Sequence, residues 1–259
     1  MIEVHNLTFG YSATEDGQIL KGVDFAAKTG KLTALIGTNG AGKSTLLKTI
    51  MGILKGKGEI SVNGKPVSQY STKDFSSTVS YLSQDNDCKV NLSVFEVVML
   101  GRMGSMSFRV SDEDIAATQE VLERLNLQRF ASRSIMELSG GQRQLVFMAQ
   151  ALVKEPKILI LDEPTSALDL HKQFDLLTLL KNLTQENDFT TLVTLHHLDL
   201  AAMFADEIIV LKEGTVYAQG APKDIFTEAM MEDVYRVKTK IYMDDNWLPH
   251  VIPLEAIIN

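Results

Sequence analysis

The residues that most constrain this chain lie between positions 37 and 44, where the sequence reads Gly-Thr-Asn-Gly-Ala-Gly-Lys-Ser. These eight residues match the phosphate-loop pattern G-x-x-x-x-G-K-[ST] at every position. They follow an apolar run over 32–36, which predicts a buried strand, and they precede a segment over 45–51 whose apolar spacing predicts a helix. A strand, this loop and a helix in succession are the context that a phosphate-binding loop requires. We therefore expect the chain to bind a nucleotide.

The residue types in this loop suit a phosphate group. Its glycines allow a tight turn in which successive N–H groups converge on phosphate oxygens at a helix N-terminus, where the helix dipole also favours anions. Lys43 is expected to reach the β- and γ-phosphates, and the hydroxyl of Ser44 is expected to bind Mg²⁺. The residues predicted to bind the nucleotide here are Gly37, Thr38, Asn39, Gly40, Ala41, Gly42, Lys43, Ser44 and Thr45.

Composition limits the classes of protein to which the chain can belong. With 259 residues, 45% of them hydrophobic and 22% charged, it can form one large globular domain or two small ones. The sequence shows neither a basic segment followed by an apolar one at its start nor an apolar run of about 18 residues, so we expect a cytosolic protein. Its single cysteine, Cys88, excludes an intrachain disulfide, and the net charge of −8 argues against nucleic acid as a partner.

Strand-like and helix-like segments alternate along much of the chain, which predicts an α/β fold with a mostly parallel sheet. Helical periodicity dominates from 85 to 155, where Ser93 and Glu96 form a capping-box pattern. The predicted strands span residues 2–9, 19–26, 32–36, 58–62, 79–82, 157–161, 190–195 and 207–211.

This order predicts a phosphate-loop NTPase core, an N-terminal antiparallel β part and an inserted helical part. We expect one domain, with its core over 1–84 and 156–221, its helical part over 85–155 and a short C-terminal extension over 222–259. Ligands of parallel sheets bind at the carboxyl ends of the strands. The residues that fall at such ends are Gly37, Gln84, Asp162 and His196.

A second candidate phosphate receptor lies at Leu138-Ser139-Gly140-Gly141-Gln142, just before a predicted helix. Its serine and glycine N–H groups could cap a phosphate much as the first loop does. A chain with one complete phosphate loop does not need a second receptor for the same nucleotide. The second receptor therefore predicts a nucleotide held by another copy of the chain.

Taken together, these motifs resemble those of ATP-binding-cassette ATPases, in the same order and across nearly the full length. The matching features are the aromatic Tyr11, the loop over 37–44, Gln84, the signature over 138–142, the pair Asp162-Glu163, the turn over 166–169 and the switch histidine His196.

The resemblance implies that ATP and Mg²⁺ are the cofactors and assigns a role to each motif. Tyr11 would stack on the adenine, while Ser44, Gln84 and Asp162 would hold or sense Mg²⁺. Glu163 would polarise the attacking water and His196 would contact the γ-phosphate. Two chains would close head to tail, so that Ser139, Gly140, Gly141 and Gln142 of one copy face the nucleotide of the other.

Among cassette proteins, the segment Val98-Met99-Leu100-Gly101-Arg102 and the ending over 249–254 resemble the ATPases of siderophore, haem and cobalamin importers. That resemblance implies transmembrane permease subunits and an extracytoplasmic substrate-binding protein as partners, with this chain at the cytoplasmic face of the membrane. The segment Met103-Gly104-Ser105 departs from the group's pattern, which keeps import of another metal ion or small solute as an alternative.

Two further alternatives come from soluble cassette proteins. A soluble ATPase of iron–sulphur cluster assembly is disfavoured by Gly141-Gln142-Arg143-Gln144, where that group usually carries an acidic residue and lysines. A DNA-repair cassette is disfavoured because the interval before Leu138 has no long heptad insertion. Finally, Met99, Met103, Met106 and Phe108 predict an apolar groove in which a short helix of a permease could dock.

Overall fold

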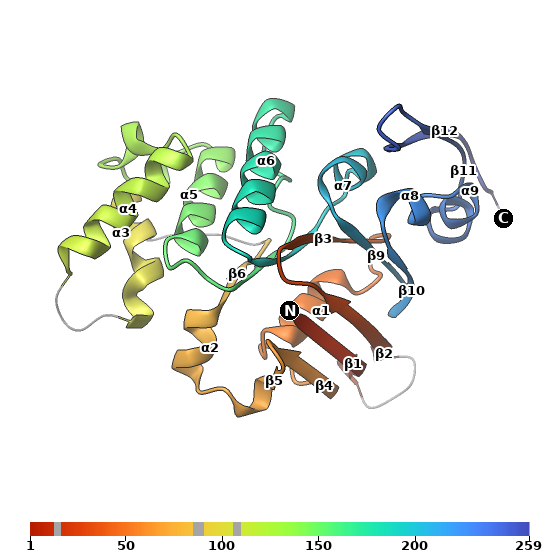
Figure 1. Cartoon of the computed structure of the whole chain (residues 1–259), viewed down its shortest axis with the longest axis horizontal. Coiled ribbons are helices and arrows are strands. Elements are labelled where there is room, and N and C mark those ends of the chain that lie inside the picture. Colours follow the sequence, from red (N-terminus) through yellow and green to blue (C-terminus); the bar gives the residue numbers. More distant parts are fainter. Residues whose placement is uncertain (13–16, 85–90, 106–109, 259) are drawn as a thin grey trace. The chain divides into compact units, whose positions relative to one another are not determined.

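The computed structural model describes residues 1–12, 17–84, 91–105 and 110–258 (Figure 1). These residues form two compact units, of which the first combines 1–69 with 180–259 and the second spans 70–179. Cys88, Met106 and Phe108 lie outside the described residues. Within the described ranges, no helix has both the length and the apolar character needed to cross a bilayer.

The first unit begins with the predicted antiparallel part. The strand β1 pairs with β2 on one side and with β4 on the other, so that Val4 faces Phe25 and Ile60. The turn Asn63-Gly64, with positive φ at both residues, joins β4 to β5 as an Asn-Gly hairpin dipeptide should. The strands of this sheet are β1 (Ile2–Gly10), β2 (Gln18–Ala27), β4 (Lys57–Val62) and β5 (Lys65–Pro66).

A second group of strands in this unit is mostly parallel. The strand β3 lies between β8 and β9 and runs parallel to both, while β10 is antiparallel to β9. The side chains of β3 from Leu32 to Ile36 are buried, which explains why this strand reads as an unbroken apolar run. The elements are β3 (Lys31–Ile36), α1 (Lys43–Ile50), β8 (Thr190–Thr194), α7 (Leu198–Phe204), β9 (Glu207–Lys212) and β10 (Thr215–Gly220).

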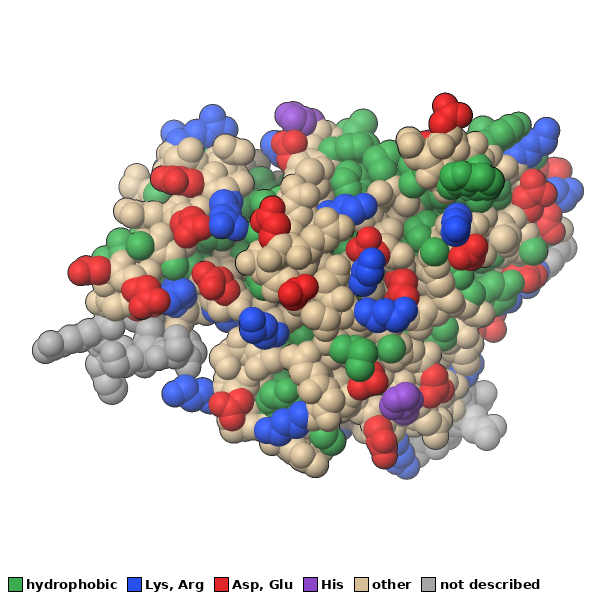
Figure 2. Space-filling model, viewed as in Figure 1, with side chains coloured by type: hydrophobic (Ala, Val, Ile, Leu, Met, Phe, Trp, Pro, Cys, Tyr) green, Lys and Arg blue, Asp and Glu red, His purple; other side chains and the backbone are tan. Residues whose placement is uncertain are grey.

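The C-terminal extension holds two short helices, a π-helical turn and a β-hairpin, the last of which the sequence analysis did not predict. The elements are α8 (Pro222–Ile225), α9 (Glu228–Met230), the turn Met231–Tyr235, β11 (Val237–Met243) and β12 (Pro249–Ala256). Figure 2 shows hydrophobic side chains on the surface of this part of the chain. Among its exposed hydrophobic residues are Tyr242, Trp247, Ile252 and Leu254.

The second unit contains the predicted helical part together with two strands. Its helices α3, α4 and α5 contact one another (Figure 1). The strand β6 runs parallel to β7, with Leu82 opposite Leu161. The long helix α6 (Leu170–Glu186) begins in this unit and ends in the first. The other elements are α2 (Thr72–Thr78), β6 (Val79–Leu82), α3 (Val94–Met99), η3 (Leu100–Ser105), α4 (Asp112–Arg124), η4 (Gln128–Phe130), η5 (Ile135–Glu137), α5 (Gly140–Leu152) and β7 (Ile158–Leu161).

Serine side chains define where the main helices of this unit begin. Ser93, Ser111 and Ser139 each accept a hydrogen bond from the third residue of the helix that follows, and that residue's side chain accepts from the serine N–H in return. The capping box predicted at Ser93 and Glu96 is thus confirmed. It also lowers the pKa of the Glu96 carboxyl, because the serine hydroxyl and N–H stabilise its charged form.

Candidate nucleotide-binding and hydrolysis site

The phosphate loop joins β3 to α1, as the sequence predicts. Gly42 stands at the N-cap of α1 with φ of 103°, and no side chain caps this helix, in contrast to the serine-capped helices of the second unit. The first turn of α1 also carries no acidic residue. Uncapped amides at a helix N-terminus, without a competing carboxylate, fit a phosphate group.

Lys43 lies folded within this loop. Its ammonium group donates hydrogen bonds to the carbonyl oxygens of Gly37 at 2.8 Å and Thr38 at 3.0 Å, and the residue is only 7% exposed. The cation is therefore held among the loop's own carbonyls, at the place where the β- and γ-phosphates are expected.

Residues 211 and 214, far from the loop in the sequence, contact it directly. Gly37 has φ of 148°, and a Cβ atom there would come within 2.2 Å of the Leu211 carbonyl oxygen in β9, so only glycine fits. The Gly214 N–H donates to the Ala41 carbonyl at 3.2 Å, and the Gly214 carbonyl accepts from the Lys21 N–H in β2 at 2.8 Å. The turn between β9 and β10 thus ties the loop to the antiparallel sheet.

Tyr235, at the end of the π-helical turn, reaches the same loop. Burial raises the pKa of the Tyr235 phenol above its ordinary value, and the neighbouring backbone N–H of Gly37 opposes this shift without cancelling it. Sequence reasoning missed both Tyr235 and Gly214. A turn signal, Glu213-Gly214 between two strand-like runs, was present for Gly214, whereas no local pattern marks Tyr235.

Tyr11 and His196 also belong to the first unit. Tyr11 follows the last residue of β1, is 71% exposed and meets the Phe9 ring edge-on with centroids 5.1 Å apart. His196 is exposed two residues beyond β8, whose Thr194 pairs with Leu35 of β3. Because β3 and β8 are parallel neighbours, His196 and the start of the phosphate loop lie at the same edge of the sheet.

The second unit brings the expected catalytic carboxylate, Glu163, beside Gln84, and it places the expected Mg²⁺ ligand, Asp162, next to Leu82. The Asp162 N–H donates to the Leu82 carbonyl at 2.8 Å, which aligns the carboxyl ends of β6 and β7. Asp162 is 1% exposed, and Glu163 follows in the left-handed region with φ of 51°. The Gln84 side-chain amide, Nε2, donates to Glu163 Oε2 at 2.8 Å.

The signature residues begin α5 and pack against the turn over 166–169. A Cβ atom on Gly141 would lie 2.8 Å from the Ala167 carbonyl oxygen, whereas one on Gly140 would meet no atom within 4 Å. The Ser139 N–H donates to Gln142 Oε1 at 2.9 Å, and the Gln142 N–H donates to Ser139 Oγ at 3.3 Å. If a phosphate bound here, its oxygens would replace these capping side chains as the acceptors of the helix N–H groups.

The turn over 166–169 is itself held in place by two side chains. Gln173, which sequence reasoning missed, is buried and donates to the carbonyls of Thr165 and Leu168. Asp169 accepts from the Lys172 N–H and ammonium, and these hydrogen bonds lower the pKa of the Asp169 carboxyl. The turn is therefore presented in one conformation beside Gly141.

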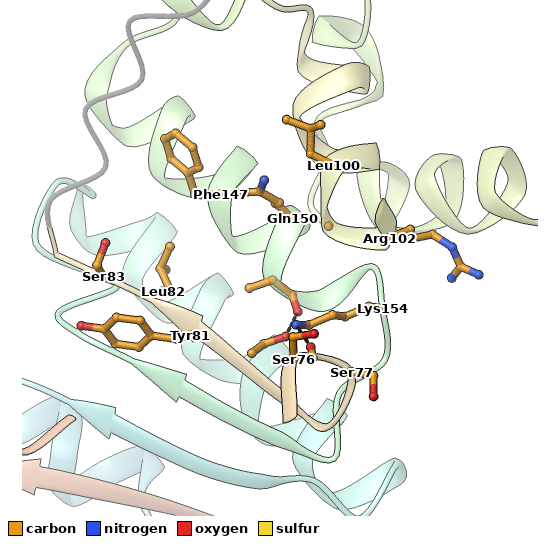
Figure 3. Close-up of a pocket in the computed structure, with 13 residues that line it drawn as sticks. Ser76, Ser77, Tyr81, Leu82, Ser83, Leu100, Arg102, Phe147, Gln150 and Lys154 are labelled. Atoms are coloured by element: carbon orange, nitrogen blue, oxygen red, sulfur yellow. Dashed lines mark hydrogen bonds between the residues drawn. The ribbon is translucent and has the colours of Figure 1, made fainter. Parts of the chain in front are cut away.

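A pocket of about 390 Å³ opens beside β6 in the second unit, and we call it the β6–α5 pocket (Figure 3). Tyr81, Leu82 and Ser83, the three residues before Gln84, form part of its wall. Gly101 forms another part, and a Cβ atom there would lie 2.2 Å from the Gln150 carbonyl, so this glycine lets η3 approach α5 closely. The neighbouring Arg102 forms an ion pair with Asp114 at 2.5 Å. Hydrogen bonds from Arg102 and from Ser111 lower the pKa of the Asp114 carboxyl to about 2.

Residues 20–166 of the chain match the family described as ABC transporter. The chain is an ABC transporter ATPase. It is 37% identical over 246 residues to the iron(3+)-hydroxamate import ATP-binding protein of Bacillus subtilis, with 94% of this chain and 90% of that protein covered. The predicted α/β fold with its antiparallel part and helical insertion is confirmed by solved structures of the family.

Two solved structures illustrate that agreement. An inward-facing structure of a transporter described as metal-chelate type matches this ABC ATPase with a TM-score of 0.83 and 29% identity, over 98% of this chain and 97% of that one. A dimeric ATP-binding cassette with ADP and inorganic phosphate bound matches with a TM-score of 0.77 and 29% identity, over 86% of this chain and 99% of that one. ABC ATPases bind and hydrolyse ATP, and this chain carries the complete phosphate loop of the family.

Proposed function

We propose that this ABC ATPase is the ATP-hydrolysing subunit of an importer for an iron–siderophore or a related metal chelate, docked on separate permease subunits at the cytoplasmic face of the membrane. The observation that carries this proposal is the similarity to the hydroxamate import ATP-binding protein, which extends over 94% of this chain. The comparisons give no support to a soluble ATPase of iron–sulphur assembly. An extracytoplasmic binding protein would deliver the chelate to the permease.

Within each copy, we assign a role to each residue at the strand ends. The phosphate-loop amides and Lys43 would bind the phosphates, Tyr11 would stack on the adenine, and His196 would contact the γ-phosphate. Ser44, Gln84 and Asp162 would hold or sense Mg²⁺, which would neutralise the charge that develops on the phosphates. Glu163 would orient and polarise the attacking water, since its carboxylate is already held by Gln84 at 2.8 Å.

We propose that two copies complete each site. Gly140 faces open space, and the capping box of Ser139 presents the N-terminus of α5, so the signature can receive the γ-phosphate of a nucleotide bound to the other copy. ATP would then hold the dimer together. Hydrolysis removes the γ-phosphate and releases the dimer, as in other phosphate-dependent switches.

The β6–α5 pocket is the docking site that we propose for a permease segment. The sequence predicted a groove around Met99, Met103, Met106 and Phe108, and the residues that line the described pocket include Leu100, Phe147 and Lys154. The side chain of Met103 lies outside the described parts of the structure, as do Met106 and Phe108. Because the lining residue Ser83 directly precedes Gln84 in the chain, an occupant of the pocket could move Gln84, which donates a hydrogen bond to Glu163.

Co-purification tests this function. The tagged chain, expressed in its host, should be isolated from detergent-solubilised membranes together with its permease subunits, and the permease should stimulate its ATP hydrolysis. The expected partners are the integral membrane subunits of a chelate importer. Mass spectrometry identifies them, and a reciprocal pull-down with a tagged permease subunit confirms the interaction. Recovery of the chain solely with soluble assembly proteins would overturn the proposal.

A further inference from the structure

The β6–α5 pocket has two chemically different ends. Leu100, which is 41% exposed, and Phe147 stand at one end, and Lys154 stands with Ser76 and Ser77 at the other (Figure 3). With a volume of about 390 Å³, the pocket has room for a few side chains of one short segment but not for a folded domain.

The polar end of the pocket is cationic. Among the described residues, its lining includes two cations, Arg102 and Lys154, and no carboxylate. Arg102 is compensated, because Asp114 pairs with it at 2.5 Å and the Val153 carbonyl accepts from its Nη1 at 3.1 Å. Among the described lining residues, Lys154 is therefore the cation whose charge can attract a partner of opposite charge.

Lys154 is held at this end by backbone groups. Its ammonium donates to the carbonyl oxygen of Ser76 and, at 3.0 Å, to that of Val79. Among the described residues, no carboxylate forms an ion pair with it. The side chain is half-buried, and burial lowers the pKa of the Lys154 ammonium. A partly desolvated cation without a counter-charge is stabilised by an incoming carboxylate.

The position of Lys154 connects this charge to the catalytic residues. Val79, whose carbonyl it binds, is the first residue of β6, and the same strand ends two residues before Gln84. The Ser80 hydroxyl further ties β6 to α5 by donating to the Ala151 carbonyl at 2.6 Å. A charge that pairs with Lys154 therefore acts on the strand that positions Gln84.

We infer that the permease segment that occupies the β6–α5 pocket presents an acidic side chain to Lys154 and an apolar side chain to Leu100 and Phe147. This inference rests on the proposed function, because it specifies the chemistry of the partner that docks there. The partner's carboxylate supplies the counter-charge that the pocket lining lacks, and its apolar side chain covers the exposed Leu100.

Charge substitutions in the co-purified complex test the inference. Lys154→Glu should weaken assembly with the permease about tenfold or more and Lys154→Gln by less, whereas Lys154→Arg should assemble nearly as wild type does. Lys157→Glu is the matched control, since Lys157 is an exposed lysine three residues away that does not line the pocket. Melting temperature and ATP binding of each isolated variant separate loss of docking from loss of folding.

Reversal of charge on the partner gives the second measurement. Each Asp or Glu in the cytoplasmic loops of the permease is replaced by Lys, and one of these variants should restore assembly with Lys154→Glu while binding wild type poorly. The inference is overturned if folded Lys154→Glu and Lys154→Gln assemble like wild type, or if no reversal restores assembly. Failure of the wild-type chain itself to co-purify with a permease would instead count against the proposed function.

Discussion

Gln84 Nε2 lies 2.8 Å from Glu163 Oε2 and donates a hydrogen bond to it. This contact joins the end of β6 to the residue that follows β7, so the candidate catalytic carboxylate is attached to the strand that lines the β6–α5 pocket. The orientation of a carboxylate depends on the position of the group that donates a hydrogen bond to it, so a displacement of Gln84 would reorient Glu163. The contact is therefore a physical route by which docking could control hydrolysis.

Glu163→Gln should retain ATP binding but lower the rate of hydrolysis by about 100-fold or more, because the charge that activates water is lost while the shape of the side chain is kept. The variant should accumulate as an ATP-bound dimer. Hydrolysis rates and size-exclusion chromatography with ATP measure both effects, and Glu186→Gln, at the far end of α6, is the control. Wild-type turnover by Glu163→Gln would remove Glu163 from the mechanism.

Tyr11→Ala should weaken ATP binding by about 1 kcal/mol through loss of stacking, without affecting any phosphate contact. Hydrolysis at saturating ATP should change less. Tyr11→Phe keeps the ring and should bind ATP almost as wild type does. If calorimetry gives equal dissociation constants for ATP with wild type, Tyr11→Ala and Tyr11→Phe, then Tyr11 only packs against Phe9 and does not contact the nucleotide.

Tyr235→Phe removes the phenolic oxygen beside the Gly37 N–H while it keeps the ring. Loss of this polar contact with the phosphate loop should reduce ATP affinity by about 1 kcal/mol and leave the melting temperature nearly unchanged. The matched control is Tyr242→Phe, at an exposed position of β11 in the same extension. If both variants bind ATP equally well, Tyr235 does not position the phosphate loop.

Ser139→Arg should leave ATP binding by the monomer intact but abolish dimer-dependent hydrolysis, because the signature serves the opposite copy. Mixing it with Lys43→Ala should restore one of the two composite sites in a heterodimer. A mixture of Lys43→Ala with the double variant Lys43→Ala/Ser139→Arg should restore none. Absence of recovery in a heterodimer that demonstrably forms would contradict the two-copy site.

The sequence was sufficient to predict the phosphate loop, because strand, glycine pattern and helix are all local signals. It also predicted which strand ends carry Gln84, Asp162 and His196, since the alternation of strands and helices specifies a parallel sheet. The contact between Gln84 and Glu163 is consistent with that topology, because each residue lies two positions beyond the end of one of two neighbouring parallel strands.

The contacts that the sequence did not predict are tertiary. Tyr235 is far from Gly37 in the chain, and Gln173 acts on a turn through its side chain, so neither leaves a periodic pattern. The hairpin β11–β12 was missed because Pro249 and Pro253 argue against a central strand, but β12 has an open edge on which proline is tolerated. The docking groove around Met99, Met103, Met106 and Phe108 stays a prediction, because Met106 and Phe108 lie outside the described residues. The described pocket is lined in part by Leu100, Phe147 and Lys154.

The measurement that tests the central claim most directly is chelate transport by the purified complex. Proteoliposomes contain the chain assembled with its permease. ATP is supplied on the side of the membrane where the chain lies, and a ferric hydroxamate bound to the substrate-binding protein is supplied on the opposite side. The account predicts ATP-dependent accumulation of the chelate, which Glu163→Gln stops although that complex assembles and binds ATP. Equal accumulation with wild type and Glu163→Gln, or ATP hydrolysis without movement of any metal chelate, would contradict it.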